Sequence, residues 1–267
     1  MPPMRTERVD AWRGPAPGRP ELPLPPGRMP PLRGGRPLKR WRWVGAFGPD
    51  AMACATRVSI GGVPVAWWVV WDGERLHERL HRRAAPVRME PGHARAAGLD
   101  LRFEETEGVE VVSPHGAQYI WTRKQGGIPV RGTVLGRPFA GYGVVDDTAG
   151  YHARHTAWRW SVGVGTAESG ARVAWNLVEG VHDGDPSERT VWVDGTPHPI
   201  EPLAFADDLS AVGDLRCEPV AVRAHRARLL LLASEYEMPF GRFSGSLPRA
   251  GALREGWGVM ERHRVRW

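Results

Sequence analysis

The strongest constraint on the fold is an alternation of apolar and polar residues with a period of two. In residues 99–104 every second side chain is apolar, and residues 63–71 form a nearly continuous apolar run that ends at the turn sequence Asp72-Gly73. This period is that of a β-strand, because neighbouring side chains of a strand point to opposite faces of the sheet. With roughly 14–16 such stretches between turns, the pattern predicts an all-β sandwich or barrel. One stretch, residues 74–83, fits a helix about as well as a polar strand.

Composition narrows the class of protein further. The chain has 267 residues, of which 42% are hydrophobic and 25% are charged, as is typical of a globular protein. No stretch reaches the ~20 apolar residues of a membrane span, and residues 1–13 lack the apolar segment of a secretory signal, so we expect a cytoplasmic protein. Two cysteines, Cys54 and Cys217, are too few for a disulfide scaffold or a four-thiolate zinc site.

The net charge of +6 is concentrated at the amino terminus. Residues 1–43 carry ten basic and three acidic side chains, a net charge of +7, whereas the remaining residues sum to −1. Eleven of the 25 prolines lie in residues 1–40, and proline favours an extended chain. We therefore expect an extended, basic, Pro-rich arm over residues 1–40. Nucleic acid is an expected partner of this arm only.

An internal repeat predicts two β-domains after the arm. Residues 141–146 and 256–261 both follow the order glycine, aromatic, glycine, valine, apolar, acid, and they are 115 positions apart. Each copy is followed by a histidine and a tryptophan. We expect a first β-domain over residues 41–165 and a second over residues 166–267.

Three stretches of the chain also resemble a known family. They are Arg36-Pro37-Leu38-Lys39-Arg40-Trp41-Arg42-Trp43, Val112-Ser113-Pro114-His115-Gly116 with Trp121-Thr122-Arg123-Lys124-Gln125, and the segment 145–160. By these motifs, from about Leu32 to the carboxyl terminus, the chain resembles the bacterial domain-of-unknown-function family 2804. More distantly it is similar to tandem lipocalin-like proteins, the class of hydroxyneurosporene synthase and tocopherol cyclase. That resemblance implies two antiparallel β-barrels holding a hydrophobic ligand for acid catalysis, although here the acid and the histidine are not adjacent.

The segment 146–160 holds the densest candidate chemistry. Adjacent strand residues face opposite ways, so only one of Asp146 and Asp147 can enter a cavity. A carboxyl group in an apolar pocket has a raised pKa and can protonate an alkene or a leaving oxygen. We expect Asp147 to be this acid and His155 to orient it. In the alternative interpretation, Asp147 caps a turn and the histidines bond the backbone. The candidate catalytic residues are Asp147, His155, Asp146 and His152.

A second set of residues is expected to bind the ligand. Lys124 is one of only two lysines among 36 basic residues, and a lysine differs from an arginine in that it can lose its proton when buried. The tryptophans would wall the cavity or stabilise a cation through their π faces. Two histidines three apart suit a helix better than a strand, so we expect no metal and no cofactor. The candidate ligand-binding residues are Trp121, Lys124, Tyr151, Trp158, Trp160, Glu261 and His263.

These features lead to one functional hypothesis and two alternatives. The first is a protein that binds a hydrophobic small molecule in a Trp-lined β-barrel cavity, with or without hydratase, cyclase or isomerase activity. The second is a carbohydrate-active protein with an open Trp-lined groove and two facing carboxylates. The third is a non-catalytic scaffold whose basic arm contacts an anionic surface. The sequence indicates neither the ligand nor the oligomeric state.

Overall fold

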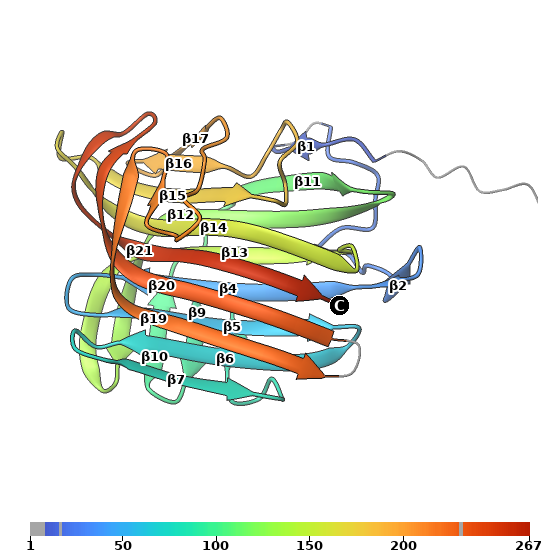
Figure 1. Ribbon diagram of the computed structural model, residues 1–267, viewed down its shortest axis with the longest axis horizontal. Coiled ribbons are helices and arrows are strands. Elements are labelled where there is room, and N and C mark those ends of the chain that lie inside the picture. Colours follow the sequence, from blue (N-terminus) through green and yellow to red (C-terminus); the bar gives the residue numbers. More distant parts are fainter. Residues whose placement is uncertain (1–8, 16–17, 230–231) are drawn as a thin grey trace, which may run out of the picture.

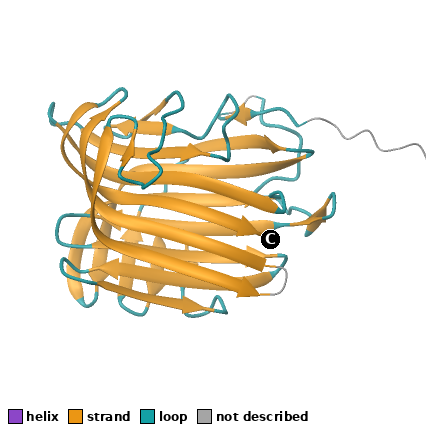
Figure 2. Ribbon diagram, in the orientation of Figure 1, coloured by secondary structure: helices purple, strands orange, loops and turns teal. Residues whose placement is uncertain are grey.

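Two large antiparallel sheets make up the fold, and they follow each other along the chain (Figure 1). The computed structural model describes residues 9–15, 18–229 and 232–267. Figure 2 shows strands and loops, and no helix occurs in these described residues. None of them forms a helix long and apolar enough to cross a membrane. The prediction of an all-β protein built from two packed antiparallel units is confirmed.

The first sheet has eleven strands within the described residues. Its main order is β7-β6-β5-β4-β13-β12-β10-β9-β8, with β11 paired to β12 and to β1. The bounds are β1 (Trp12–Arg13), β4 (Lys39–Phe47), β5 (Met52–Ile60), β6 (Val63–Trp71), β7 (Leu76–His81), β8 (Arg88–Glu90), β9 (His93–Ala96), β10 (Leu99–Phe103), β11 (Val109–His115), β12 (Gln118–Val134) and β13 (Arg137–Gly150). A separate short pair joins β2 (Leu32–Arg33) to β3 (Arg36–Pro37).

Residues 74–83, whose sequence fits a helix about as well as a strand, contain strand β7. The turn before it is fixed by Asp72, whose Oδ1 accepts hydrogen bonds from the backbone N–H groups of Glu74 and Arg75. The chain then reverses, and Leu76 pairs with Trp71 on β6. The segment is therefore a strand and not a helix, because the hairpin turn places it beside β6, with which it can pair.

The second sheet has eight strands in the described part of the chain, in the order β17-β16-β15-β14-β21-β20-β19-β18. Its bounds are β14 (His155–Ala167), β15 (Arg172–Glu179), β16 (Thr190–Val193), β17 (Thr196–Pro199), β18 (Ala211–Val212), β19 (Leu215–Leu229), β20 (Leu232–Leu247) and β21 (Gly251–Arg266). The order β7-β6-β5-β4-β13-β12 of the first sheet matches β17-β16-β15-β14-β21-β20 of the second. The placement of the domain boundary between residues 165 and 166 stays a prediction, since membership of a sheet does not define an independently folding unit.

Both sheets pack against a shared apolar core. The largest cluster of buried side chains takes residues from both sheets and is rich in tryptophan, with Trp43, Trp67 and Trp71 from the first and Trp160 and Trp257 from the second. Each sheet also has a core of its own, formed by residues of that sheet and of the loops that connect its strands. Indoles suit such an interface because each buries a large area and keeps one N–H to donate. The shared core therefore contains both apolar walls and hydrogen-bond donors.

Candidate functional site

The two glycine-containing repeats place their acids at matching points of the two sheets. Asp146 ends the first repeat on β13 and Glu261 ends the second on β21, and both side chains are buried. In register with them are Trp43 on β4 and Trp160 on β14. The rings of these two tryptophans meet edge to face with centroids 5.0 Å apart. The two acids are therefore equivalent positions on either side of the contact between the sheets.

A second repeat, the triplet Trp-Arg-Trp, gives each acid a hydrogen-bond donor. The triplet occurs at residues 41–43 of β4 and at residues 158–160 of β14. In each copy the indole Nε1 of the first tryptophan donates to the acid of its own sheet, over 3.1 Å to Asp146 Oδ2 and over 2.7 Å to Glu261 Oε1. The two donating rings stack with centroids 6.4 Å apart and planes 9° apart. The two acids are thus connected through a pair of stacked indoles.

Asp146 belongs to a buried ionic cluster that joins the sheets. Lys124 Nζ on β12 lies 2.6 Å from Asp146 Oδ1 and 3.2 Å from Glu188 Oε1. Glu188 comes from the segment between β15 and β16, so it belongs to the second sheet's half of the chain. His182, from the same segment, places Nε2 3.6 Å from Glu188 Oε2. Thr148 donates a further hydrogen bond of 3.0 Å to Asp146. All five side chains are buried.

One ammonium group in this cluster faces two carboxyl groups. Burial opposes the charge of Lys124, but Asp146 and Glu188 outweigh it and raise the pKa of the ammonium. Against its own burial, Lys124 and His182 lower the pKa of Glu188 to about 2. Burial raises the pKa of Asp146, and the charge of Glu188 adds to this rise. Lys124 is therefore shared by the two carboxyl groups, and of the two Glu188 loses its proton more readily.

Glu261 is held by hydrogen bonds without an ion pair. Its Oε2 accepts a bond of 2.8 Å from the Tyr236 hydroxyl, which also lies 2.9 Å from Met238 Sδ. Among the described residues no cationic side chain forms a salt bridge with this carboxyl group. Burial is the main cause that raises the pKa of Glu261 to about 7, against the hydrogen bonds from Tyr236 and Trp158, while the charge of Asp146 raises it further. Glu261 is thus a buried acid that can be protonated at neutral pH.

His263 forms one wall beside this acid. Its ring centroid lies 4.4 Å from that of Trp158 and 5.1 Å from that of Tyr236. Its Nε2 lies 2.8 Å from Ser234 Oγ. Burial and the charge of Arg223 lower the pKa of His263 to about 3, so the imidazole is neutral at neutral pH. This residue can pack against a ligand or relay a hydrogen bond, but it cannot supply a charge.

His152, expected to be catalytic, lies beside Trp41, the tryptophan that donates a hydrogen bond to Asp146. Its ring is 5.1 Å from Trp41, 5.8 Å from His115 and 6.0 Å from Trp267. Burial lowers the pKa of His152 well below its ordinary value, and the charges of His115 and Lys39 lower it further. The residue is a neutral part of an aromatic cluster.

Asp147 and His155 are not brought together. Asp147 is in register with Arg42 and Arg123, and its carboxylate lies 3.2 Å and 2.9 Å from their guanidinium nitrogens. His155 is exposed at the start of β14, opposite Arg266. No hydrogen bond or ion pair joins the two residues among the interactions of the described chain. Only one of the adjacent aspartates lies in the shared interior, as predicted, and it is Asp146.

Two expected ligand-binding residues, Trp121 and Tyr151, lie under the amino-terminal segment. They share an apolar cluster with Leu24 and Met29, which precede β2. The Tyr151 hydroxyl donates to the carbonyl of Pro30 over 2.8 Å. These side chains hold the described part of the Pro-rich segment against the first sheet.

Several residues of the site escaped sequence analysis. Glu188 and His182 lie between strands, where no periodic pattern marks a buried position. Asn176, the only asparagine of the chain, accepts a bond of 2.8 Å from Trp160 Nε1 and donates to the Glu188 carbonyl over 3.1 Å. Trp41 could have been found from the Trp-Arg-Trp repeat. Within the described residues no group of three or more histidine, cysteine, aspartate or glutamate side chains could hold a metal ion.

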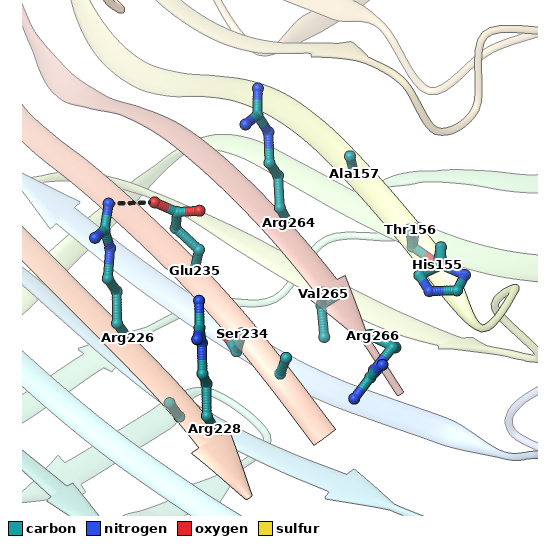
Figure 3. Close-up of a pocket in the computed structure, with 12 residues that line it drawn as sticks. His155, Thr156, Ala157, Arg226, Arg228, Ser234, Glu235, Arg264, Val265 and Arg266 are labelled. Carbon is teal, nitrogen blue, oxygen red and sulfur yellow. Dashed lines mark hydrogen bonds and ion pairs between the residues drawn. The ribbon is translucent and has the colours of Figure 1, made fainter. Parts of the chain in front are cut away.

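Two hollows of the surface lie at the ends of these strands. One, of about 530 Å³, is shown in Figure 3 and is lined by His155, Thr156, Ala157, Arg226, Ala227, Arg228, Ala233, Ser234, Glu235, Arg264, Val265 and Arg266. The other, of about 650 Å³, is lined by Pro49, Asp50, Trp71, Asp72, Gly73, Glu74, Arg137, Val220, Arg242 and Trp257. Ser234 connects the first hollow to His263, and so to the surroundings of Glu261.

Fold and site together define an all-β protein of two antiparallel units with buried acids where they meet. The family model for the domain of unknown function DUF2804 matches residues 77–267. The chain belongs to this family, as its motifs predicted, and the match includes the second and third motifs but not residues 36–43.

Solved structures show only a distant likeness. A protein provisionally called AttH from Nitrosomonas europaea is 13% identical, with 92% of this chain and 98% of that chain covered and a TM-score of 0.41. CghA with Sch210972 is 9% identical over 92% and 95% of the two chains, with a TM-score of 0.39. Kievitone hydratase from Nectria haematococca is 9% identical over 83% and 88%, with a TM-score of 0.37. No curated protein matches the chain.

Proposed function

We propose that the chain binds a neutral, apolar small molecule where the two sheets meet, and that Glu261 protonates it. The observation that carries this proposal is a buried carboxyl group with a pKa of about 7 and no salt bridge among the described residues. A general acid works best when its pKa is near the working pH, because it then holds a proton and also releases it readily. Asp146, the equivalent acid, has Lys124 beside it and is less suited to donate.

The surroundings of Glu261 suit a ligand that becomes cationic when protonated. Trp158 and Tyr236 donate hydrogen bonds to the acid, and Trp67 packs on Tyr236 with ring centroids 6.3 Å apart. The guanidinium of Arg223 lies 4.3 Å and 5.0 Å from the ring centroids of Trp67 and Tyr236, so these rings already face a cation. Aromatic faces stabilise a positive charge while remaining apolar towards a neutral ligand. His263 adds a neutral imidazole to the same wall. Trp158 and the neutral His263 therefore offer this acid apolar neighbours that suit a ligand which gains a positive charge.

The proton balance is simple for an alkene ligand. Glu261 transfers its proton to one alkene carbon and leaves a carbocation on the other. The carboxylate that remains keeps its hydrogen bonds from Trp158 and Tyr236, which stabilise the negative charge. Addition of water, with loss of a proton to Glu261, completes a hydration. Loss of a proton from a neighbouring carbon to Glu261 completes an isomerisation instead.

The hollow of about 530 Å³ supports an entry route at the ends of β14, β20 and β21. Ser234 lines it and contacts His263, which packs on Tyr236 and Trp158. His263 lies between this route and Glu261, because it contacts Ser234 on one side and the rings of Tyr236 and Trp158 on the other.

The carbohydrate alternative has weaker support. The second hollow contains Trp71 and Trp257, which stack at 6.2 Å, and acidic residues nearby. Both indoles are less than one-tenth exposed, so neither offers an open ring face to a sugar. The carboxylate of Asp72 is also occupied by the turn and by His77 at 2.7 Å. We therefore favour the apolar ligand.

The test combines binding of Nile red, a neutral apolar dye, with turnover of a panel of isoprenoid alkenols. We expect Nile red to bind the native chain and alkenols to displace it. Glu261→Gln keeps the shape of the side chain, so dye binding should persist while turnover falls by roughly a hundredfold or more. Glu218→Gln, at an exposed position of β19 that lines neither hollow, is the matched control and should change neither. Absence of dye binding, or full turnover by Glu261→Gln, would refute the proposal.

A further inference from the structure

The outer face of the second sheet ends in a group of cationic side chains. Residues paired across neighbouring strands point to the same face. One row of paired residues is His155, Arg266, Ala233 and Arg228, and the next is Ala157, Arg264, Glu235 and Arg226. Figure 3 shows these side chains around the hollow of about 530 Å³. We call His155, Arg226, Arg228, Arg264 and Arg266 the strand-end patch.

The positive charge of the strand-end patch is largely uncompensated. Its one acidic neighbour, Glu235, pairs with Arg226 at 2.5 Å. Within the described residues, no ion pair or side-chain hydrogen bond is formed by the other three arginines of the patch. One row further along the strands, Arg262 pairs with Glu237 at 2.5 Å and Arg159 with Glu179 at 2.7 Å. Acidic partners therefore balance the arginines of the neighbouring row, whereas in the patch only Arg226 has such a partner.

The hollow itself has room for an anionic group. Ala157 and Ala233 line it between the arginines, and their short side chains leave the space that the guanidinium groups surround. Guanidinium groups bind phosphate through paired N–H donors, which makes arginine well suited to this ligand. The guanidinium groups at its rim therefore suit a phosphate-bearing partner.

The sequence beside the patch favours lipid over nucleic acid. Strand β19 ends at Leu229 and β20 begins at Leu232, and the chain between them reads Leu230-Leu231, so four consecutive leucines follow Arg228. Sequences that connect paired strands usually carry glycine, asparagine, aspartate or proline. Apolar residues beside basic ones are typical of segments that meet a membrane surface, whereas leucine has no partner on a nucleic acid backbone.

We propose that the strand-end patch docks the protein on membranes that contain anionic phospholipids. A negatively charged bilayer surface attracts basic side chains near it, and each contributes about a fivefold gain in partitioning. Docking at this point would bring the bilayer to the hollow that Ser234 connects to His263. The docking does not depend on acid catalysis by Glu261, so either proposal can fail without the other.

The experiment measures flotation of the full chain with vesicles of phosphatidylcholine alone and of phosphatidylcholine mixed with phosphatidylserine. The test variant carries Arg228→Gln, Arg264→Gln and Arg266→Gln. The control variant removes the same charge from exposed arginines elsewhere, with Arg131→Gln, Arg137→Gln and Arg249→Gln. We expect binding to mixed vesicles only, and a loss of roughly a hundredfold in the test variant with little loss in the control. Thermal unfolding confirms that both variants fold.

Several results would overturn the proposal. Equal losses in both variants would make total charge, including that of the amino-terminal arm, responsible. Unchanged binding in the test variant, or equal binding to neutral vesicles, would mean that the patch is not the anchor. Double-stranded DNA and inorganic phosphate are each added as a competitor. If DNA bound more tightly than vesicles with the same dependence on the three arginines, or if only free phosphate bound, the partner would not be a membrane.

Discussion

The two repeats hold equivalent acids in different electrostatic surroundings. Asp146 and Glu261 each end the same six-residue motif, and each accepts a hydrogen bond from the first tryptophan of a Trp-Arg-Trp triplet. In the first sheet the neighbouring strand β12 adds Lys124 at 2.6 Å. In the second sheet β20 adds the hydroxyl of Tyr236 at 2.8 Å. The two acids thus share the same strand arrangement and the same tryptophan donor. They differ in the residue from the neighbouring strand, which is the cationic Lys124 for Asp146 and the neutral Tyr236 for Glu261.

This difference separates a structural acid from a titratable one. Lys124 also reaches Glu188 from the other half of the chain, so the first cluster ties the sheets together. Glu261 has only neutral donors, and burial can therefore raise its pKa to about 7. A duplicated frame thus allows one copy to stabilise the contact between the sheets and the other to keep an exchangeable proton.

The largest effect is expected from Lys124→Met. The substitution leaves Asp146 and Glu188 buried without their ammonium, and loss of one partner of a buried ion pair typically costs about 3–5 kcal/mol. Urea unfolding at neutral pH should show this loss in the free energy of unfolding. The double variant Lys124→Met with Glu188→Gln is the control and should recover part of it, since fewer charges remain unpaired. A loss below about 1 kcal/mol for Lys124→Met would show that the ionic cluster does not hold the sheets together.

The second effect concerns the pH dependence of stability. The pKa of Glu261 is about 7 in the folded chain and 4.5 as an ordinary glutamate, so the folded state binds the proton more tightly. Its contribution is fully present below pH 4.5 and is lost as the pH rises through 7, a decrease of about 3 kcal/mol. Glu188, with a pKa lowered from 4.5 to about 2 by Lys124, has the opposite sign: its contribution is lost as the pH falls below 4.5.

Unfolding of Glu261→Gln measured from pH 4.5 to 8 tests this assignment. The free energy of unfolding of the Glu218→Gln control minus that of Glu261→Gln should fall by about 3 kcal/mol from pH 4.5 to pH 8. The difference is the quantity to compare, because buried histidines with a lowered pKa, such as His263, raise the stability of both variants over the same range. A difference that stayed constant with pH would show that Glu261 is not the group that titrates.

The strands and the equivalence of the two acids could be predicted from the sequence, but the residues that contact each acid could not. Alternation with a period of two gave the strands, and the glycine-aromatic-glycine motif related Asp146 to Glu261. Alternation also required Asp146 and Asp147 to face opposite ways. It could not say which faces inward, because that depends on how the sheet packs, and Asp147 in fact meets Arg42 and Arg123.

Partners that come from distant segments left no such signal. Glu188 reaches Lys124 across the contact between the sheets from an irregular segment, and its burial follows from that contact alone. Residue types that are rare in this chain indicated buried polar positions better than periodicity did. Both lysines of the chain, Lys39 and Lys124, are buried, and so is the only asparagine, Asn176. An uncommon residue in a chain rich in arginine therefore marked the interior, although its role could not be inferred.

A smaller effect is expected from Tyr236→Phe. The change removes the hydroxyl that donates to Glu261 Oε2, and this hydrogen bond lowers the pKa of the carboxyl group. The pKa of Glu261 should therefore rise above 7. Infrared titration of the protonated carboxyl band, identified by its absence in Glu261→Gln, measures the shift. A pKa that stayed the same or fell would mean that the hydroxyl does not stabilise the ionised form.

The smallest effect distinguishes the two acids most directly. Trp41→Phe and Trp158→Phe each remove one indole donor from equivalent acids, and each should cost about 1 kcal/mol in the free energy of unfolding through the lost hydrogen bond. The consequences for titration should differ, because Lys124 still faces Asp146 whereas Glu261 keeps only Tyr236. The pH midpoint at which the protonated carboxyl band of Glu261 disappears should therefore rise in Trp158→Phe and stay the same in Trp41→Phe. Equal shifts in both variants would mean that the stacked indoles couple the two acids, so that neither titrates independently of the other.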